Sequence, residues 1–355
     1  LHLCDRRQRQ MCIRDRDRTK AGNFADKFYS LIPDTQRLDI AVGYITADSL
    51  VELKQIVAMN NINKLNLIIG MHYLDLFTEA EYRSAVALNK FLLEENKGEV
   101  RLVTPFRFHG KMYSFTNSSG AFAGIIGSNN LSGIFENGNR IYETSVLLEN
   151  KTHAEQMQKF ILELQSTSTD NIGNLLINKF RMANSLLENH EFVEKIDNHE
   201  LAECIAACTG TSFDIPIKAT PKSNLNVFFG RGRVNNTTGL VKARHWYEVE
   251  LIVPKKITVQ AEFPKAGTDS ASFYVITDDG WKFKCNVNGD YSKNFRSEND
   301  LKILGKWIKG RLENAGALSV GELVTEDVLH KYGRDTFTFT KTRKPDLWYL
   351  DFKVR

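Results

Sequence analysis

Five polar residues in the first half of the chain have the types and spacing that chemistry on a phosphodiester requires. His109 and Lys111 are two positions apart, so a strand would point both side chains to the same side. Ser128 and Asn130 follow a short apolar run that is typical of a buried strand, and Glu143 lies in a second strand-like run. The pattern therefore predicts that these side chains turn toward a common point.

These residue types match the steps of phosphodiester cleavage. Lys111 would supply fixed positive charge, and Ser128 and Asn130 would donate hydrogen bonds to the non-bridging oxygens. The imidazole of His109 can act as a nucleophile when a carboxylate orients its other nitrogen. The alternative is a structural histidine beside a solvated lysine. A histidine and lysine two apart are common by chance, but the ordered set with a later glutamate is much more specific.

Hydrophobic periodicity around these residues predicts an α/β domain with helices on the faces of a mixed sheet. The expected strands are 37–45, 64–70, 99–104, 121–126 and 141–148, and the expected helices are 48–59, 79–96 and 152–164. Residues 166–214 form a polar connector in which helices are predicted over 174–187 and 191–208.

From residue 215 onward the composition changes to short aromatic and β-branched runs that are separated by Gly, Asn and Asp. The expected strands are 225–229, 247–253, 257–263, 272–276, 281–287, 336–340 and 347–352. One helix is expected over 301–315, and a second begins after Ser319. Asp278-Asp279-Gly280 predicts a hairpin turn. The pattern favours a small barrel or sandwich.

Positive charge is concentrated in this second half. Residues 211–355 hold 24 Lys and Arg against 17 Asp and Glu, whereas the whole chain carries +4. Two basic loops between the expected strands are candidate DNA contacts, because Arg and Asn suit base edges and Lys suits phosphates. Ordinary solvated loop charge is the alternative. The candidate DNA-binding residues are Arg231, Arg233, Lys242, Arg244, Lys293, Asn294 and Arg296.

Composition narrows the class of protein further. Five cysteines, an odd number in a chain of 355 residues, do not suggest a disulfide framework, and Cys204 and Cys208 are expected to be reduced core thiols rather than zinc ligands. The motif has no acidic cluster suited to Mg²⁺ nearby, so no metal or cofactor is predicted. No apolar run approaches a membrane span and no secretory signal is visible, so a bacterial cytoplasmic protein without membrane contact is expected.

These observations divide the chain into four predicted segments. Residues 1–18 begin without Met and are rich in Arg and Asp, so they are expected to be a non-native or disordered leader; a basic DNA-binding arm is the alternative. A nuclease domain is expected over 19–165, the helical connector over 166–214, and a DNA-recognition domain over 215–355.

The combination of His-x-Lys, Gly-Ser-x-Asn and a later Glu resembles the signature of the phospholipase D superfamily. The Asp that usually follows the Lys is missing, and Thr116 stands seven positions after His109. The restriction endonucleases of the NgoFVII and BfiI type share that departure. The second half is similar to the B3-like DNA-recognition domain of those enzymes, chiefly over 304–311 and 332–341. The resemblance implies a phospholipase-D-like α/β domain followed by a mainly β, B3-like pseudobarrel.

The resemblance also implies an activity. A site-specific restriction endonuclease of this type would hydrolyse double-stranded DNA by a metal-independent double displacement through a phosphohistidine, with Glu143 orienting a histidine. The superfamily uses two His-x-Lys sites and this chain has one, so a homodimer is implied. Some relatives act with a separate ATP-dependent helicase-like subunit, which leaves that partner open. The alternatives are a non-specific nuclease or lipid phosphodiesterase with the same fold, or a catalytically inert DNA-binding protein.

Overall fold

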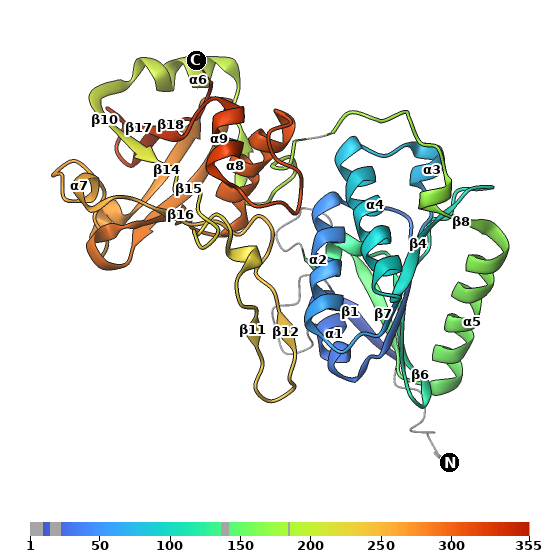
Figure 1. The fold of residues 1–355 in the computed structure, drawn as a ribbon. Helices are drawn as coiled ribbons and strands as arrows, with labels where there is room; N and C mark the ends of the chain where they lie inside the picture. The colour runs from blue at the N-terminus through green and yellow to red at the C-terminus, as the bar shows by residue number, and fades with distance from the viewer. Residues whose placement is uncertain (1–9, 15–22, 136–141, 184, 355) are drawn as a thin grey trace, which may run out of the picture. The chain divides into compact units, whose positions relative to one another are not determined.

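The structure is a computed structural model that describes residues 10–14, 23–135, 142–183 and 185–354. The chain divides into two compact units (Figure 1). Among the described residues, the first unit runs to Ala183 and also takes in Gly232–Ala243; the second comprises the remainder. The described part of the chain holds no helix that is long and apolar enough to cross a membrane.

An eight-stranded mixed sheet forms the centre of the first unit, in the order β1-β7-β6-β5-β2-β3-β4-β8. The three central strands β2, β3 and β4 are parallel, and β5 and β8 flank them in the antiparallel direction. The strands are β1 Gln10–Arg14, β2 Arg37–Val42, β3 Lys64–Ile69, β4 Gly98–Val103, β5 Lys111–Asn117, β6 Gly120–Gly127, β7 Thr144–Leu148 and β8 Thr169–Asn171.

Helices cover both faces of this sheet, with α2 and α4 on one side and α5 on the other (Figure 1). The helices are α1 Phe24–Leu31, α2 Ala47–Met59, α3 His72–Asp75, α4 Glu79–Glu94 and α5 Lys151–Ser168, with short 3-10 turns at Ile32–Asp34, Leu131–Ile134 and Ile172–Asn174. Capping boxes start α2 at Thr46 and α4 at Thr78, which satisfies the first backbone donors of each helix. Apolar side chains of the sheet are buried on both faces, and Met157 and Ile161 of α5 cover one of them.

His72 is buried in the first unit, and its two hydrogen-bond partners favour the neutral imidazole. The backbone N–H of Ile45 donates to its Nε2 at 3.1 Å, and its Nδ1 lies 3.3 Å from the carbonyl oxygen of Leu76. This pair of partners fits a single proton on Nδ1, because a proton on Nε2 would face another donor. Burial lowers the pKa of His72 to about 4, against 6.5 in an unfolded chain; the Leu76 carbonyl opposes that shift.

The unfolding free energy should therefore depend on pH through His72. A histidine whose pKa falls on folding contributes stability that is complete above pH 6.5 and is lost as the pH falls toward 4, by about 3 kcal/mol. Urea unfolding of the wild-type chain and of His72→Gln at several pH values checks this. The variant should lose less stability between pH 6.5 and pH 4 than the wild type, and an identical loss in both proteins would contradict the assignment.

A curled mixed sheet forms the centre of the second unit, in the order β10-β17-β18-β14-β15-β16-β13, with β9 pairing to β15. The strands are β9 Val193–Lys195, β10 Cys208–Pro216, β13 Leu251–Ile252, β14 Ser272–Thr277, β15 Trp281–Asn288, β16 Asn294–Ser297, β17 Thr336–Thr342 and β18 Leu347–Asp351. The helices are α6 Asn198–Ala206, α7 Lys255–Thr258, α8 Lys302–Asn314 and α9 Glu326–Tyr332. Aromatic rings pack in the core of this unit, and the rings of Phe339 and Trp348 are stacked with 4.2 Å between their centroids.

The prediction of helices over 174–187 and 191–208 is wrong except at Asn198–Ala206. Tertiary contacts override the local helix propensity there. Arg181 donates its backbone N–H to Phe77 and its guanidinium to Glu81, which draws this stretch along the first unit. Residues 193–195 instead form β9 and pair with β15.

Three strand predictions in the second half also need correction. Residues 225–229 contain a 3-10 turn at Val227–Phe229, because the Asn226 side chain bonds to the backbone of Thr220 and Val324. Residues 257–263 do not form a strand, since the run begins inside the short helix α7, Lys255–Thr258, whose N-cap is Pro254. Only Leu251–Ile252 forms a strand in the run 247–253.

Part of the predicted leader belongs to the first sheet. Residues 10–14 form β1, which pairs antiparallel with β7. The rest of residues 1–18 lie outside the described part of the chain, so the origin of this segment stays a prediction.

Candidate active site

The strand register brings the ends of four strands to one edge of the first sheet. Lys111, the first residue of β5, lies opposite Val42, the last residue of β2. Gly127, the last residue of β6, lies opposite Ser145 in β7. The loops before β5, after β6 and before β7 therefore meet at this edge. They carry His109, Ser128, Asn130 and Glu143, and the fifth predicted residue, Lys111, begins β5.

His109 and Lys111 differ in their surroundings, which corrects the prediction that one strand carries both. The strand begins at Lys111, so His109 lies in the preceding loop and is exposed, whereas Lys111 is only 5% exposed. The Lys111 ammonium donates to the carbonyl oxygen of His109 at 2.8 Å. A methyl group at Gly43 would lie 2.8 Å from Cδ2 of His109, so the absence of a side chain there leaves room for the imidazole.

Glu143 lies one residue before β7, not inside a strand as predicted. Burial lowers the pKa of Lys111, and the negative charge of Glu143 raises it again. Burial and Glu143 also raise the pKa of Tyr113, which lies two residues further along β5. The Glu143 carboxylate therefore favours the charged form of Lys111, the lysine of the motif.

Ser128 joins the loop after β6 to the start of β7. Its backbone N–H donates to the Thr144 carbonyl at 2.9 Å, and its hydroxyl exchanges two hydrogen bonds with the Thr144 backbone, at 3.0 and 3.2 Å. These bonds hold the residue that follows Glu143. Ser128 is exposed, and its hydroxyl donates to the Thr144 carbonyl oxygen. The hydroxyl would have to rotate to donate to a phosphate instead.

Asn130 is oriented by a residue that the sequence did not indicate. The backbone N–H of Tyr44 donates to Oδ1 of Asn130 at 3.0 Å, so the amide NH₂ of Asn130 remains to donate to a ligand. The neighbouring Asn129 is buried, donates to the Ser145 hydroxyl at 2.9 Å, and accepts from the Tyr113 hydroxyl at 2.8 Å. Strands β5 and β7 thus fix the loop that carries Ser128 and Asn130.

Three residues that the sequence did not indicate, Tyr44, Asp75 and Arg107, form a connected group in which Tyr44 contacts His109. The Tyr44 ring meets the His109 ring edge-on, with 5.7 Å between centroids. The Tyr44 hydroxyl donates to Asp75 at 2.8 Å, and Nε of Arg107 donates to the other oxygen of Asp75 at 2.8 Å. Tyr44 follows the end of β2, and that position is the only sequence signal that could have suggested it.

The first basic loop forms a hairpin of β11 Arg233–Val234 and β12 Val241–Lys242 that belongs to the first unit. The Asn60 side chain bonds to both backbone groups of Val241, at 3.0 and 3.1 Å. Lys242 lies over the Tyr29 ring at 4.2 Å. Arg233 lies opposite Lys242 across the hairpin and is exposed, as is Arg231 just before it.

Arg231 and the other predicted DNA-binding residues lie in the second unit, and all of them except Arg231 are half-buried. Arg244 pairs with Glu248 at 2.6 Å, and Arg296 bonds to Asn286 at 3.2 Å. Lys293 lies 3.7 Å from Asp290. The structure does not bring the seven predicted residues into one patch of one unit, and their role in DNA binding stays a prediction.

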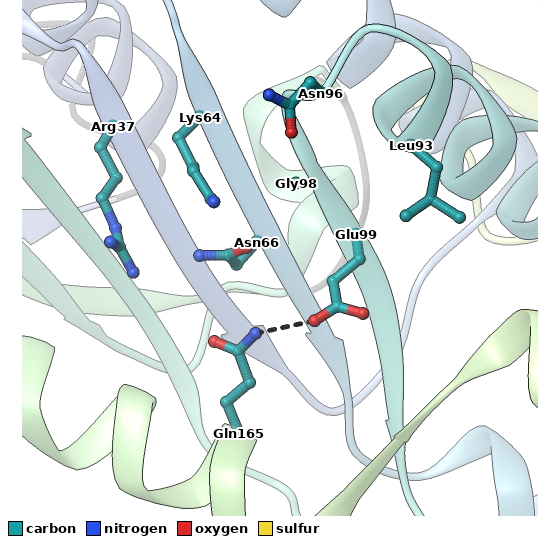
Figure 2. Close-up of a pocket in the computed structure, with 8 residues that line it drawn as sticks. All are labelled: Arg37, Lys64, Asn66, Leu93, Asn96, Gly98, Glu99 and Gln165. Carbon is teal, nitrogen blue, oxygen red and sulfur yellow. Dashed lines mark hydrogen bonds between the residues drawn. The ribbon is translucent and has the colours of Figure 1, made fainter.

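A polar pocket of about 420 Å³ occupies the opposite end of the first sheet (Figure 2). Arg37 and Lys64, the first residues of β2 and β3, line it together with Glu99 and Gln165, whose amide donates to Glu99 at 3.2 Å. None of the five motif residues lines this pocket. The motif site is therefore separate from this pocket.

Comparison with protein families gives a match for each half of the chain. Residues 23–177 match the NgoFVII restriction endonuclease N-terminal phospholipase D domain, and residues 203–343 match the NgoFVII C-terminal B3-like DNA-binding domain. The chain therefore consists of a phospholipase-D-like nuclease domain followed by a B3-like DNA-binding domain, and the predicted fold class is confirmed. The chain belongs to the NgoFVII type of restriction endonuclease, as the sequence motifs indicated.

Three of the solved structures that resemble this chain cover less than half of it, at low sequence identity. Nuc from Salmonella typhimurium, a phospholipase D family member, is 15% identical over 46% of this chain and 96% of its own, with a TM-score of 0.29. NucT from Helicobacter pylori is 14% identical over 45% of this chain and 96% of its own, with a TM-score of 0.32. TrmBL2, an archaeal chromatin protein, is 15% identical over 45% of this chain and 53% of its own, with a TM-score of 0.30. This chain thus spans about half of the length of TrmBL2. No curated protein matches the chain.

Proposed function

We propose that this protein is a site-specific endonuclease that cuts double-stranded DNA without a metal ion, through a phosphohistidine at His109. The observation that carries the proposal is the meeting of the motif loops at one sheet edge, with Lys111 buried beneath an exposed His109. An exposed imidazole can reach a phosphodiester, while a buried ammonium offers charge in surroundings where water screens it weakly.

The reaction would proceed in two displacements. In the first, a His109 nitrogen attacks phosphorus, a P–N bond forms, and the P–O bond to the leaving strand breaks. A second imidazole gives its proton to the leaving oxygen and then takes a proton from water, whose oxygen attacks phosphorus and breaks the P–N bond. Lys111, Ser128 and Asn130 would stabilise the charge on the pentacovalent phosphorus.

The second imidazole would come from another copy of the chain. This sequence contains one His-x-Lys motif, so the acid would be His109 of the partner subunit, placed by a two-fold axis that joins identical patches. Exposed apolar side chains near this edge, Phe106 at 44% and Tyr142 at 53%, are the kind of surface that such a contact would cover. A separate ATP-dependent helicase-like subunit is not required by this scheme.

Plasmid cleavage in the presence of EDTA tests the proposal. Double displacement through an imidazole needs no metal, so the cleavage rate should be unchanged by excess chelator, to within about twofold. A magnesium-dependent restriction enzyme on the same plasmid is the control and should stop. Loss of activity with chelator and its return with Mg²⁺ would contradict the mechanism.

Sequence recognition would come from the second half of the chain and the basic hairpin. Arg231 is exposed and lies at the base of the hairpin, where a guanidinium can reach a guanine edge. In a His109→Ala background, Arg231→Ala should weaken binding to a duplex selected from random sequences by roughly 1–3 kcal/mol and change random-sequence binding less. Arg343→Ala, an exposed arginine outside both loops, is the matched control. Equal losses on both duplexes would reduce Arg231 to a phosphate contact.

A further inference from the structure

Arg107, two residues before His109, has a guanidinium group that is bonded through only one of its three nitrogens within the described residues. Its side chain is 59% exposed, and its Nε donates to Asp75 at 2.8 Å. Within the described residues, its two terminal nitrogens have no other hydrogen-bond partner. A guanidinium held through Nε keeps its outer N–H groups in a fixed plane, which is the geometry that binds two phosphate oxygens at once.

Asp75 connects this arginine to Tyr44. One carboxylate oxygen accepts from Arg107, and the other accepts from the Tyr44 hydroxyl at 2.8 Å. Arg107 and the Tyr44 hydroxyl both lower the pKa of Asp75, so the bridging group stays ionised. The bridge therefore fixes the direction of the guanidinium.

Tyr44 also contacts both halves of the catalytic motif. Its ring meets the His109 ring at an interplanar angle of 77°, and its backbone N–H orients Asn130. Residues 44, 75, 107 and 130 are far apart in the sequence, yet these hydrogen bonds join them into one connected group. A shift of Tyr44 would therefore move the nucleophile and a phosphate donor together.

We propose that Arg107 binds the DNA phosphate adjacent to the scissile one, and that Tyr44 and Asp75 are positioning residues that hold Arg107 and His109 in register. Arg107 precedes His109 by two residues, a span of at most about 7 Å, so the two side chains would meet consecutive groups of one backbone. This inference rests on the proposed phosphodiester chemistry at His109. The competing explanation is an ordinary surface ion pair, which contributes about 0–1 kcal/mol to stability and nothing to DNA.

The first experiment measures DNA affinity against salt for the full chain in a His109→Ala background. Arg107→Gln should weaken binding about threefold to tenfold and reduce the slope of log K against log salt by about 0.9, the value for one phosphate contact. Arg83→Gln is the matched control, because Arg83 forms a similar exposed pair with Glu79 in the same unit. If Arg107→Gln gives the same affinity and slope as Arg83→Gln, the phosphate contact is refuted.

The second experiment separates positioning from binding. Tyr44→Phe keeps the ring and removes the hydroxyl bond to Asp75, so the single-turnover cleavage rate should fall about tenfold while DNA affinity and melting temperature stay unchanged. Tyr73→Phe, an exposed tyrosine in α3, is the control. Adding Asp75→Asn to Tyr44→Phe also removes the charge that pairs with Arg107, so DNA affinity should then fall toward that of Arg107→Gln. A rate equal to that of Tyr73→Phe, or a fall that matches a loss of folded protein, would overturn the positioning role.

The outcomes also distinguish this inference from the proposed function. If His109→Ala abolishes cleavage while Arg107→Gln and Tyr44→Phe match their controls, only the role of Arg107, Asp75 and Tyr44 is refuted. If His109→Ala still cleaves, the proposed mechanism fails and this inference fails with it.

Discussion

Replacing His109 by alanine is expected to lower the rate of DNA cleavage by on the order of 10⁴-fold or more, because the bond that carries the reaction through its intermediate can no longer form. DNA affinity should change by less than about threefold. His109 lies in an exposed loop before β5, so its removal leaves no cavity and no buried group without a partner.

The measurement is a single-turnover rate on a duplex that carries the recognition site, with affinity determined separately by fluorescence anisotropy. His153→Ala is the matched control, because His153 is a histidine of α5 in the same unit and has no part in the motif. The control should cut at the wild-type rate. Residual cleavage by His109→Ala within about tenfold of wild type would exclude His109 as the nucleophile.

Mixing the wild-type chain with inactive His109→Ala should lower the cleavage activity by more than the dilution of the wild-type chain alone would. If each active site needs an imidazole from both subunits, activity follows the square of the wild-type fraction, so an equal mixture retains about a quarter of the activity. Subunits must be exchanged by mild denaturation and refolding before the assay. The magnitude arises because a mixed dimer has a nucleophile or an acid but never both.

The control for mixing is Arg83→Gln, which should leave activity unchanged at every ratio. A linear fall to one half in the equal mixture would mean that each chain cuts by itself. Light scattering on the same samples should give the mass of two chains, and a monomer that cuts at full rate would contradict the composite site.

Local patterns in the sequence predicted the elements that position the site. Helices α2, α4 and α5 and strands β2, β3, β4 and β6 follow the expected periodicities, because each element packs one apolar face on a core close by. The motif residues were found because their chemistry depends on a short spacing. Their meeting at one edge followed from strand direction, although Glu143 lies just before its strand and His109 lies outside β5.

The remainder of the site depends on contacts that no local pattern contains. Tyr44 reaches Asn130 and Asp75 across long stretches of chain, and neither hydrogen bond leaves a trace in spacing. The misassigned connector has the same cause, since Arg181 is held by Phe77 and Glu81 rather than by its neighbours. Tertiary pairing decided these segments against their intrinsic propensity.

The stereochemical course at phosphorus distinguishes a double displacement through His109 from direct hydrolysis by water. A duplex with one phosphorothioate of known configuration at the scissile position would be cut in ¹⁸O-labelled water, and the configuration of the product would be read by ³¹P NMR. Two successive in-line displacements, first by His109 and then by water, each invert phosphorus and together retain its configuration. We expect retention, and inversion, which marks direct attack by water, would exclude a phosphohistidine intermediate.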